Sequence, residues 1–235
     1  MEVKPEVANR IAMLKRKGIV ADVKLADMAN GEGVRTTVFV SGCMFNCYNC
    51  FNKKLQSFNY GMNNAESIKQ GQHVQDEFPR YYDQELEDKI IESLKPSYIA
   101  GITLLGGEPF MNTNITVKLA ERIRAEFSNS KTIWSWTGYE WEELMQMVKL
   151  DFPLSQQQNK LLNLIDVLVD GRYVDSIRQI DLQNNPQGIN FRGSSNQRII
   201  DVRASLSKDK IIERTDLYEG EVIVPRDQDF KKLKK

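Results

Sequence analysis

Apolar residues recur at two different spacings along the chain, and each spacing predicts one kind of element. Spacings of three and four positions predict amphipathic helices, which we expect at 84–95, 113–127 and 140–149. Runs rich in β-branched and aromatic residues predict strands, which we expect at 19–25, 36–40, 99–105, 131–137, 164–169 and 198–202. Strands and helices thus alternate from about residue 35 to residue 170, which predicts βαβ units and a mostly parallel sheet.

The remaining segments are less regular. Residues 5–17 predict a short helix that Gly18 ends, whereas residues 59–82 are polar without a clear period, so we expect a long loop or insertion there. Neither a repeat nor a second-domain boundary stands out. We therefore expect one domain over 1–235, with its core at about 20–203, an insertion at 62–82 and terminal extensions at 1–18 and 206–235.

Three of the predicted strands give way to glycine or cysteine. These points are Gly42-Cys43, Gly106-Gly107 and Thr137-Gly138. In a parallel sheet the carboxyl ends of the strands meet at one edge, and ligands bind there. We expect the three segments to lie together at that edge.

Composition and charge narrow the classes of protein. The 235 residues are 41% hydrophobic, enough for one sizeable core. Basic and acidic residues both number 32, so no excess of Lys and Arg favours nucleic-acid binding, and we interpret 231–235 as a solvated tail. The first 17 residues lack the apolar stretch of a signal peptide, and no run approaches the roughly 18 apolar residues of a membrane span. We expect a cytoplasmic protein that binds neither nucleic acid nor membrane.

The three cysteines, Cys43, Cys47 and Cys50, have the spacing C-x3-C-x2-C. An odd number packed so closely is a poor disulfide framework, whereas thiolates are good ligands for iron–sulfur clusters, zinc or copper(I). Three of them can bind three corners of a [4Fe–4S] cluster and leave one iron open to a small molecule. Zinc stays an alternative because His73, the sole histidine, would complete a Cys3His set, although we interpret His73 as an exposed loop residue.

Two motifs together resemble the radical S-adenosylmethionine (SAM) superfamily. The cysteine spacing with Tyr48 before the last cysteine is similar to the superfamily's signature, and Gly106-Gly107-Glu108-Pro109 is similar to its GGEP motif. A carboxylate such as Glu108 accepts charge-assisted hydrogen bonds from an ammonium. The family uses this segment to bind the methionine amino group of SAM. The resemblance implies an α/β fold, a partial and open TIM-type βα barrel of parallel strands.

Four further segments narrow the resemblance, at 30–35, 133–139, 166–171 and 191–198. With them the chain resembles the activating proteins of anaerobic (class III) ribonucleoside-triphosphate reductase over about 20–60 and 84–203. The resemblance implies one [4Fe–4S] cluster on the three cysteines, with SAM on the open iron. It implies reductive cleavage of SAM to a 5′-deoxyadenosyl radical, which abstracts hydrogen from a glycine of the reductase. A flavodoxin or ferredoxin is the expected electron donor.

The expected SAM contacts lie at predicted strand ends or in the loops after them: Tyr48, Asn49, Phe51, Gly106, Gly107, Glu108, Ser135, Thr137, Asp170 and Arg192. The resemblance implies that the GGEP residues hold the methionine end of SAM and that the first three residues lie along the adenosine.

The other expected contacts have alternative interpretations. Trp134 and Trp136 alternate with Ser135 and Thr137, so we interpret the tryptophans as core residues and the two hydroxyl residues as ligand-facing. Asp170 either ends a strand or contacts the cofactor. The loop with Arg192 is either a polar surface or a contact with SAM or the partner protein.

Other functions stay open at this point. A different glycyl-radical enzyme, such as pyruvate formate-lyase, is an alternative target, although Trp-Thr-Gly-Tyr at 136–139 and the lack of further cysteines argue against it. A small-molecule substrate suits an open-sided barrel less well than a bulky protein does. A zinc-stabilised binding module without catalysis would contain zinc in place of iron and sulfide. The target glycine, the oligomeric state and the role of 62–82 are not specified by the sequence.

Overall fold

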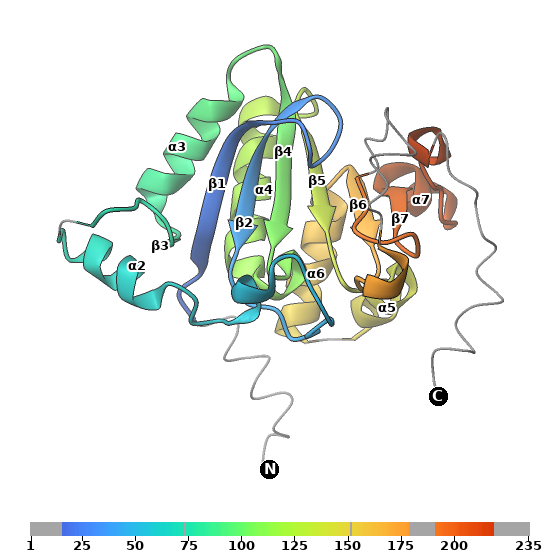
Figure 1. The fold of residues 1–235 in the computed structure, drawn as a ribbon. Helices are drawn as coiled ribbons and strands as arrows, with labels where there is room; N and C mark the ends of the chain where they lie inside the picture. The colour runs from blue at the N-terminus through green and yellow to red at the C-terminus, as the bar shows by residue number, and fades with distance from the viewer. Residues whose placement is uncertain (1–15, 73, 151, 179–190, 219–235) are drawn as a thin grey trace, which may run out of the picture.

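A computed structural model describes residues 16–72, 74–150, 152–178 and 191–218. Its seven strands form one mixed sheet in the order β3-β1-β2-β4-β5-β6-β7 (Figure 1). The strand bounds are β1 Ile19–Asp27, β2 Val34–Val40, β3 Arg80–Tyr81, β4 Ile99–Gly106, β5 Thr132–Trp136, β6 Val167–Asp170 and β7 Arg198–Asp201. The central strands β2, β4, β5 and β6 are parallel, and the flanking strands pair antiparallel. The predicted α/β class with a mostly parallel sheet is confirmed, whereas the open partial barrel stays a prediction.

The register of the parallel strands brings their carboxyl ends to one level. Val40 at the end of β2 lies opposite Gly106 at the end of β4. Ser135 of β5 pairs with Leu104 of β4, so β5 ends beside them. In Figure 1 the arrowheads of β2, β4 and β5 point the same way, toward the loop that follows β2.

Helices pack against this sheet, and the three that apolar spacing predicts, at 84–95, 113–127 and 140–149, do so through the predicted faces. The helix bounds are α2 Met62–Lys69, α3 Gln84–Leu94, α4 Thr113–Phe127, α5 Trp141–Val148, α6 Pro153–Leu164 and α7 Val202–Lys208, and the 3-10 helices are η1 Lys53–Gln56, η2 Pro109–Met111, η3 Asp175–Ile177 and η4 Thr215–Tyr218. In α3, Leu86, Ile90, Ile91 and Leu94 are all buried, as expected for residues that share one face. The Asp83 side chain starts this helix by accepting from the Leu86 N–H at 2.9 Å.

The prediction of a loop over 59–82 is wrong in part, because α2 and β3 lie within it. Helix α2 buries only Ala65, so it has almost no apolar face and leaves no period in the sequence. Its place is set by Gly61, which has a φ of 70° before its first turn, and by the Asn64 amide, which donates to the Pro79 carbonyl at 2.9 Å.

Helix α6 was not predicted at all, and its sequence explains why. Leu154, Leu161 and Leu162 are buried, but Gln158 occupies the position between them where a core helix would carry an apolar residue. The Gln158 amide is also buried and donates to the Phe110 carbonyl at 3.0 Å, which joins the helix to the segment after Glu108.

Several expectations concern residues outside the described ranges. The predicted helix at 5–17 lies outside them up to residue 15, as do His73 and the basic tail at 231–235. Within the described ranges, no helix is long and apolar enough to cross a membrane.

Candidate functional site

The cysteine loop, residues 41–58, follows β2 and folds back on its own base. The N–H of Gly42 donates to the Leu55 carbonyl at 2.7 Å, and the N–H of Cys43 donates to the Gln56 carbonyl at 2.9 Å. Asn46 and Asn49 take left-handed φ values of 49° and 50°, a conformation that asparagine tolerates well. These features fold three cysteines into one short segment at the carboxyl edge of the sheet.

The three cysteine thiols are free, half-buried and within reach of one another's charge. The pKa of Cys43 is raised to about 12, mainly by burial and to a smaller extent by the nearby Glu108, Cys47 and Cys50. Burial also raises the pKa of Cys47, with Cys50 as the next cause. Thiols in this setting ionise readily only when a cation compensates their charge, and metal binding displaces their protons.

The donor set fits an iron–sulfur cluster. Three thiolates are soft donors, the kind of ligand that iron–sulfur clusters use. In the parts of the chain that the structure describes, no three His, Cys, Asp or Glu side chains gather closely enough to hold one metal ion. In a cubane cluster each cysteine would bind a separate iron.

Glu108 lies directly beyond β4, and its carboxylate is buried with an exposed fraction of 1%. Oε1 accepts from the Thr137 hydroxyl at 2.8 Å and the Phe110 N–H at 3.0 Å, and Oε2 accepts from the Gly138 N–H at 2.7 Å. Every one of these donors is neutral, and no Lys or Arg of the described residues forms an ion pair with Glu108. Burial raises its pKa to about 7.

The environment of Glu108 fits an ammonium ligand. A buried carboxylate is unfavourable without a counter-charge, and Oε2 has a lone pair to spare beyond the Gly138 bond. A ligand ammonium supplies both the charge and the missing donor.

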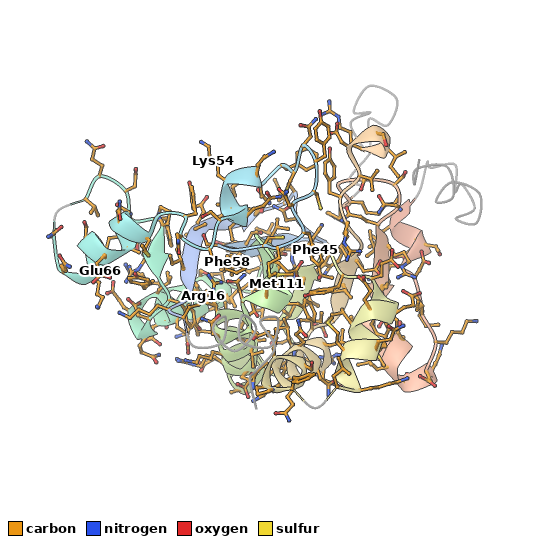
Figure 2. The ribbon with its side chains drawn as sticks, turned by 90° about the horizontal axis from the view of Figure 1, so that it is seen from below. Arg16, Phe45, Lys54, Phe58, Glu66 and Met111 are labelled. Carbon is orange, nitrogen blue, oxygen red and sulfur yellow. The ribbon has the colours of Figure 1, made fainter. Side chains whose placement is uncertain are left out.

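The three predicted strand ends do lie together. The N–H of Gly107 donates to the Val40 carbonyl at 2.7 Å, and that of Glu108 donates to the Gly42 carbonyl at 2.9 Å. A Cβ on Gly107 would come within 2.6 Å of the Gly42 carbonyl oxygen. The glycines of this motif thus allow close approach between two backbone segments, besides any approach to a ligand. Figure 2 looks onto this edge, with Phe45 of the cysteine loop and Met111 of η2 labelled.

Asn112 was missed by sequence analysis, although it joins the same two segments. Its fully buried amide donates to the carbonyls of Gly42 at 2.9 Å and of Glu108 at 2.8 Å. Asparagine four residues after a motif glutamate carries no recognisable spacing of its own, so only the fold reveals this contact.

The other predicted SAM contacts lie in different settings. Thr137 points at Glu108, whereas the fully buried Ser135 hydroxyl donates to the Trp136 carbonyl at 3.3 Å. The Asp170 carboxylate accepts from the Arg198 guanidinium and from the Trp141 N–H at 2.8 Å. Asp170 therefore joins β6 to β7 and α5, and its oxygens are already engaged.

The aromatic side chains after Cys47 are exposed. Tyr48 is 75% exposed and Phe51 is 64% exposed, with the Phe51 ring 4.8 Å from that of Tyr173. The Asn49 amide donates to the Asp175 carboxylate at 3.0 Å. The cysteine loop thereby touches the segment that follows β6.

A cavity of about 570 Å³ lies over the face of the sheet next to the cysteine loop. Phe39, Leu105 and Trp136 line it from three neighbouring strands, and Cys50 and Arg192 line it from loops. Trp134 is fully buried against Phe191, as a core residue should be, but Trp136 is only partly buried. The prediction that both tryptophans pack in the core is confirmed for Trp134 and in part for Trp136, which packs against the same cluster but also lines the cavity.

Comparison with known proteins gives a consistent result. Residues 29–200 match the family of 4Fe-4S single cluster domains. Proteins described as anaerobic ribonucleoside-triphosphate reductase-activating protein are similar to most of the chain. The relative from Vibrio cholerae is 36% identical over 177 residues, which cover 74% of this chain and 91% of the relative. The one from Escherichia coli K12 is 35% identical over 75% of this chain and 94% of its own, and that from bacteriophage T4 is 29% identical over 74% and 87%.

Proposed function

Because the chain belongs to the family of anaerobic ribonucleoside-triphosphate reductase-activating proteins, with a 4Fe–4S domain, we propose that it activates the anaerobic reductase of its own cell. The observation that carries the proposal is the sheet edge at which the loop with the three cysteines lies against Glu108, a buried carboxylate without an ion-pair partner among the described residues. The reaction is the oxidoreductase activity of a glycyl-radical activating enzyme, whose substrate is a protein.

Cys43, Cys47 and Cys50 would hold the [4Fe–4S] cluster and leave one iron without a protein ligand. When bound, the reduced cluster supplies the electron that cleaves SAM to methionine and a 5′-deoxyadenosyl radical, which takes a hydrogen atom from a glycine of the reductase. The chain's own residues bind and orient SAM and exclude water, because in such enzymes the cofactor supplies the chemistry and the protein positions it.

Glu108 would bind the ammonium of SAM through Oε2, with Thr137 and Gly138 holding the carboxylate in place. Gly106 and Gly107 would let the backbone pass close to the methionine end. Support for this assignment is the neutral donor set of Glu108, which a ligand ammonium completes.

The adenosine would lie along the exposed aromatic side of the loop, formed by Tyr48, Asn49 and Phe51. Arg192 lines the cavity beside Phe51 and its guanidinium donates to the Gln197 carbonyl at 2.9 Å, which supports a ligand-facing role. Direct contacts from Ser135 and Asp170 to SAM stay predictions.

The partly apolar cavity would receive the glycine-bearing segment of the reductase, within an open partial barrel of the radical SAM type. A single domain with its core at about 20–203, a flavodoxin or ferredoxin as electron donor and a cytoplasmic location stay predictions. The 4Fe–4S family match favours iron and sulfide over the zinc-stabilised module, and the named relatives favour the reductase over pyruvate formate-lyase.

The test is anaerobic. The protein is reconstituted with iron and sulfide, reduced, and given SAM with and without an anaerobic ribonucleotide reductase. We expect 5′-deoxyadenosine, together with a glycyl-radical EPR doublet on the reductase. Deoxyadenosine without the doublet would redirect the search to another protein substrate, and bound zinc without a cluster would refute the proposal.

A further inference from the structure

Arg16 lies at the base of the cysteine loop, although it precedes the family match, which starts at residue 29. Its guanidinium is half-buried and lies 4.2 Å from the centre of the Phe58 ring, beside which it is drawn in Figure 2. The segment predicted to be a terminal extension therefore contributes a side chain to the site.

The contacts of Arg16 fasten both ends of the loop. One Nη donates to the Ser41 carbonyl at 3.1 Å, two residues before Cys43, and the other donates to the Phe58 carbonyl at 3.3 Å, where the loop ends. A Cβ on Gly42 would come within 2.1 Å of the Phe58 ring, so the ring closes directly over the turn into the loop. Arg16 thus connects the first and last residues of the cysteine loop.

The same guanidinium reaches the glutamate motif through Asn112. Arg16 donates to the Asn112 side-chain oxygen, and the Asn112 amide donates to the carbonyls of Gly42 and Glu108. The cysteine loop and the Glu108 segment therefore share one hydrogen-bonded anchor, which ends in a positive charge.

That charge has no carboxylate partner among the described residues, whose ion pairs do not include Arg16. Burial lowers its pKa to about 10, so the guanidinium stays charged at neutral pH. A cation near a redox centre stabilises the form that carries one more electron, and the potential of iron–sulfur clusters depends on such charges.

We propose that Arg16 is a positioning residue that closes the cysteine loop and sets a positive charge against its base, where it favours the reduced form of the cluster. The proposal rests on the proposed function for the presence of the cluster. It assigns a role to the chain outside the matched family range, which neither the cysteine motif nor the GGEP motif includes.

The closing role is tested in the metal-free protein by hydrogen exchange. Arg16→Gln removes the charge and most of the contacts, Arg16→Lys retains the charge alone, and Lys17→Gln is the matched control for loss of a neighbouring cation. We expect the Gly42 and Cys43 amides to exchange at least about tenfold faster in both Arg16 variants, a change of about 1.4 kcal/mol, with α4 unchanged. Exchange in both variants equal to that of wild type and Lys17→Gln would overturn the closing role.

The electrostatic role is tested in the reconstituted proteins by a redox titration followed by EPR. The titrant adds one electron per cluster. We expect Arg16→Gln to lower the midpoint potential so that the ratio of reduced to oxidised cluster falls about tenfold at a fixed potential, which is 59 mV for one electron. Arg16→Lys should stay close to wild type, since it keeps the charge.

The outcomes separate the two proposals. An unchanged potential in Arg16→Gln would overturn the electrostatic role while leaving the proposed function intact. A wild-type protein that binds no cluster would refute the proposed function, and the exchange experiment would still decide whether Arg16 closes the loop. If Arg16→Gln alone fails to assemble a cluster while its α4 exchange is normal, the closing role is supported.

Discussion

The two ends of the parallel sheet each bury an ionisable side chain, and the two are treated differently. At the amino end, Arg35 of β2 is fully buried, and its five N–H groups all donate: to the hydroxyls of Thr103 and Thr132 and to the carbonyls of Glu32, Ile102 and Thr132. At the carboxyl end, Glu108 has neutral donors, an unused lone pair and, among the described residues, no ion-pair partner, although the charge of Arg172 acts on it without direct contact. Burial lowers the pKa of Arg35 to about 10 and raises that of Glu108 to about 7.

This difference distinguishes a buried charged residue that only stabilises the fold from one that can bind a ligand. The hydrogen-bonding capacity of Arg35 is exhausted by the three strands it ties together, so nothing is left for a ligand. Glu108 keeps an acceptor lone pair that none of its hydrogen bonds within the described residues uses, so a ligand donor can bind there. The following variants test this difference between the two ends of the sheet.

Among variants at the carboxyl end of the sheet, removal of a cluster ligand should have the largest effect on activity. We expect Cys47→Ala to abolish the site-differentiated cluster and to reduce SAM cleavage by at least about three orders of magnitude, because a cluster held at two corners loses its third anchor. Iron and sulfide content and 5′-deoxyadenosine formation are the measurements. Met44→Ala, an exposed position in the same loop, is the control, and wild-type cleavage in Cys47→Ala would refute the ligand assignment.

At the amino end, Arg35→Met should destabilise the fold by about 3–5 kcal/mol. The substitution leaves several buried oxygens, which accept from the guanidinium in the wild type, without a donor. Urea unfolding of the metal-free protein measures the loss. Arg122→Met is a matched control: Arg122 pairs with Glu87 and Asp88 at the surface, where such pairs contribute about 0–1 kcal/mol. Equal losses of unfolding free energy in the two variants would show that the hydrogen bonds of Arg35 contribute no more stability than the surface ion pairs of Arg122.

Glu108→Gln should keep the cluster but weaken SAM binding about 10- to 100-fold, because a charged hydrogen bond of about 1.5–3 kcal/mol is lost. Equilibrium binding of SAM to the reconstituted protein, with iron content as control, is the measurement. Iron loss in this variant would show that Glu108 supports the cluster and not the ligand.

The same variant tests the pKa of Glu108 in the metal-free protein. Its folded pKa of about 7 lies above the ordinary value of 4.5 for a glutamate, so between these values the folded state binds more protons and its stability falls as pH rises. The free energy of unfolding of wild type should therefore decline relative to Glu108→Gln from pH 5 to pH 8. A constant difference across that range would contradict the raised pKa.

Thr137→Val should have the smallest effect, about 2- to 10-fold weaker SAM binding, since one neutral donor to Glu108 disappears. Ser135→Ala is the matched comparison, because that hydroxyl bonds the Trp136 carbonyl instead. A larger loss from Ser135→Ala than from Thr137→Val would restore the direct SAM contact predicted for Ser135.

Sequence pattern predicted well where apolar residues do the packing. Examples are the single apolar face of α3 and the β-branched run of β2, which is buried on both faces. It failed where polar residues make the contacts, as with Gln158 in α6 and Asn64 in α2.

The candidate site divides in the same way. Cysteine spacing and the GGEP segment are local in sequence, so they identified Cys43 and Glu108 as neighbours at one sheet edge. Arg16 and Asn112 act across 25 and 70 residues respectively, and single residues at such separations leave no pattern to detect. Trp136 shows a further limit: alternation placed it on the face of Trp134 but did not reveal that this part of the face borders a cavity.

The bracing of the cysteine loop by Asn112 also sets an order of events during synthesis. Cys50 leaves the ribosome 62 residues before Asn112, a delay of about 3–12 s at about 5–20 residues per second. During that interval the three cysteines have been synthesised, but Asn112, which holds their loop in place, has not. We infer that cluster insertion follows the emergence of β4 and η2, so that a nascent chain stalled before residue 112 is a poor acceptor of iron and sulfide.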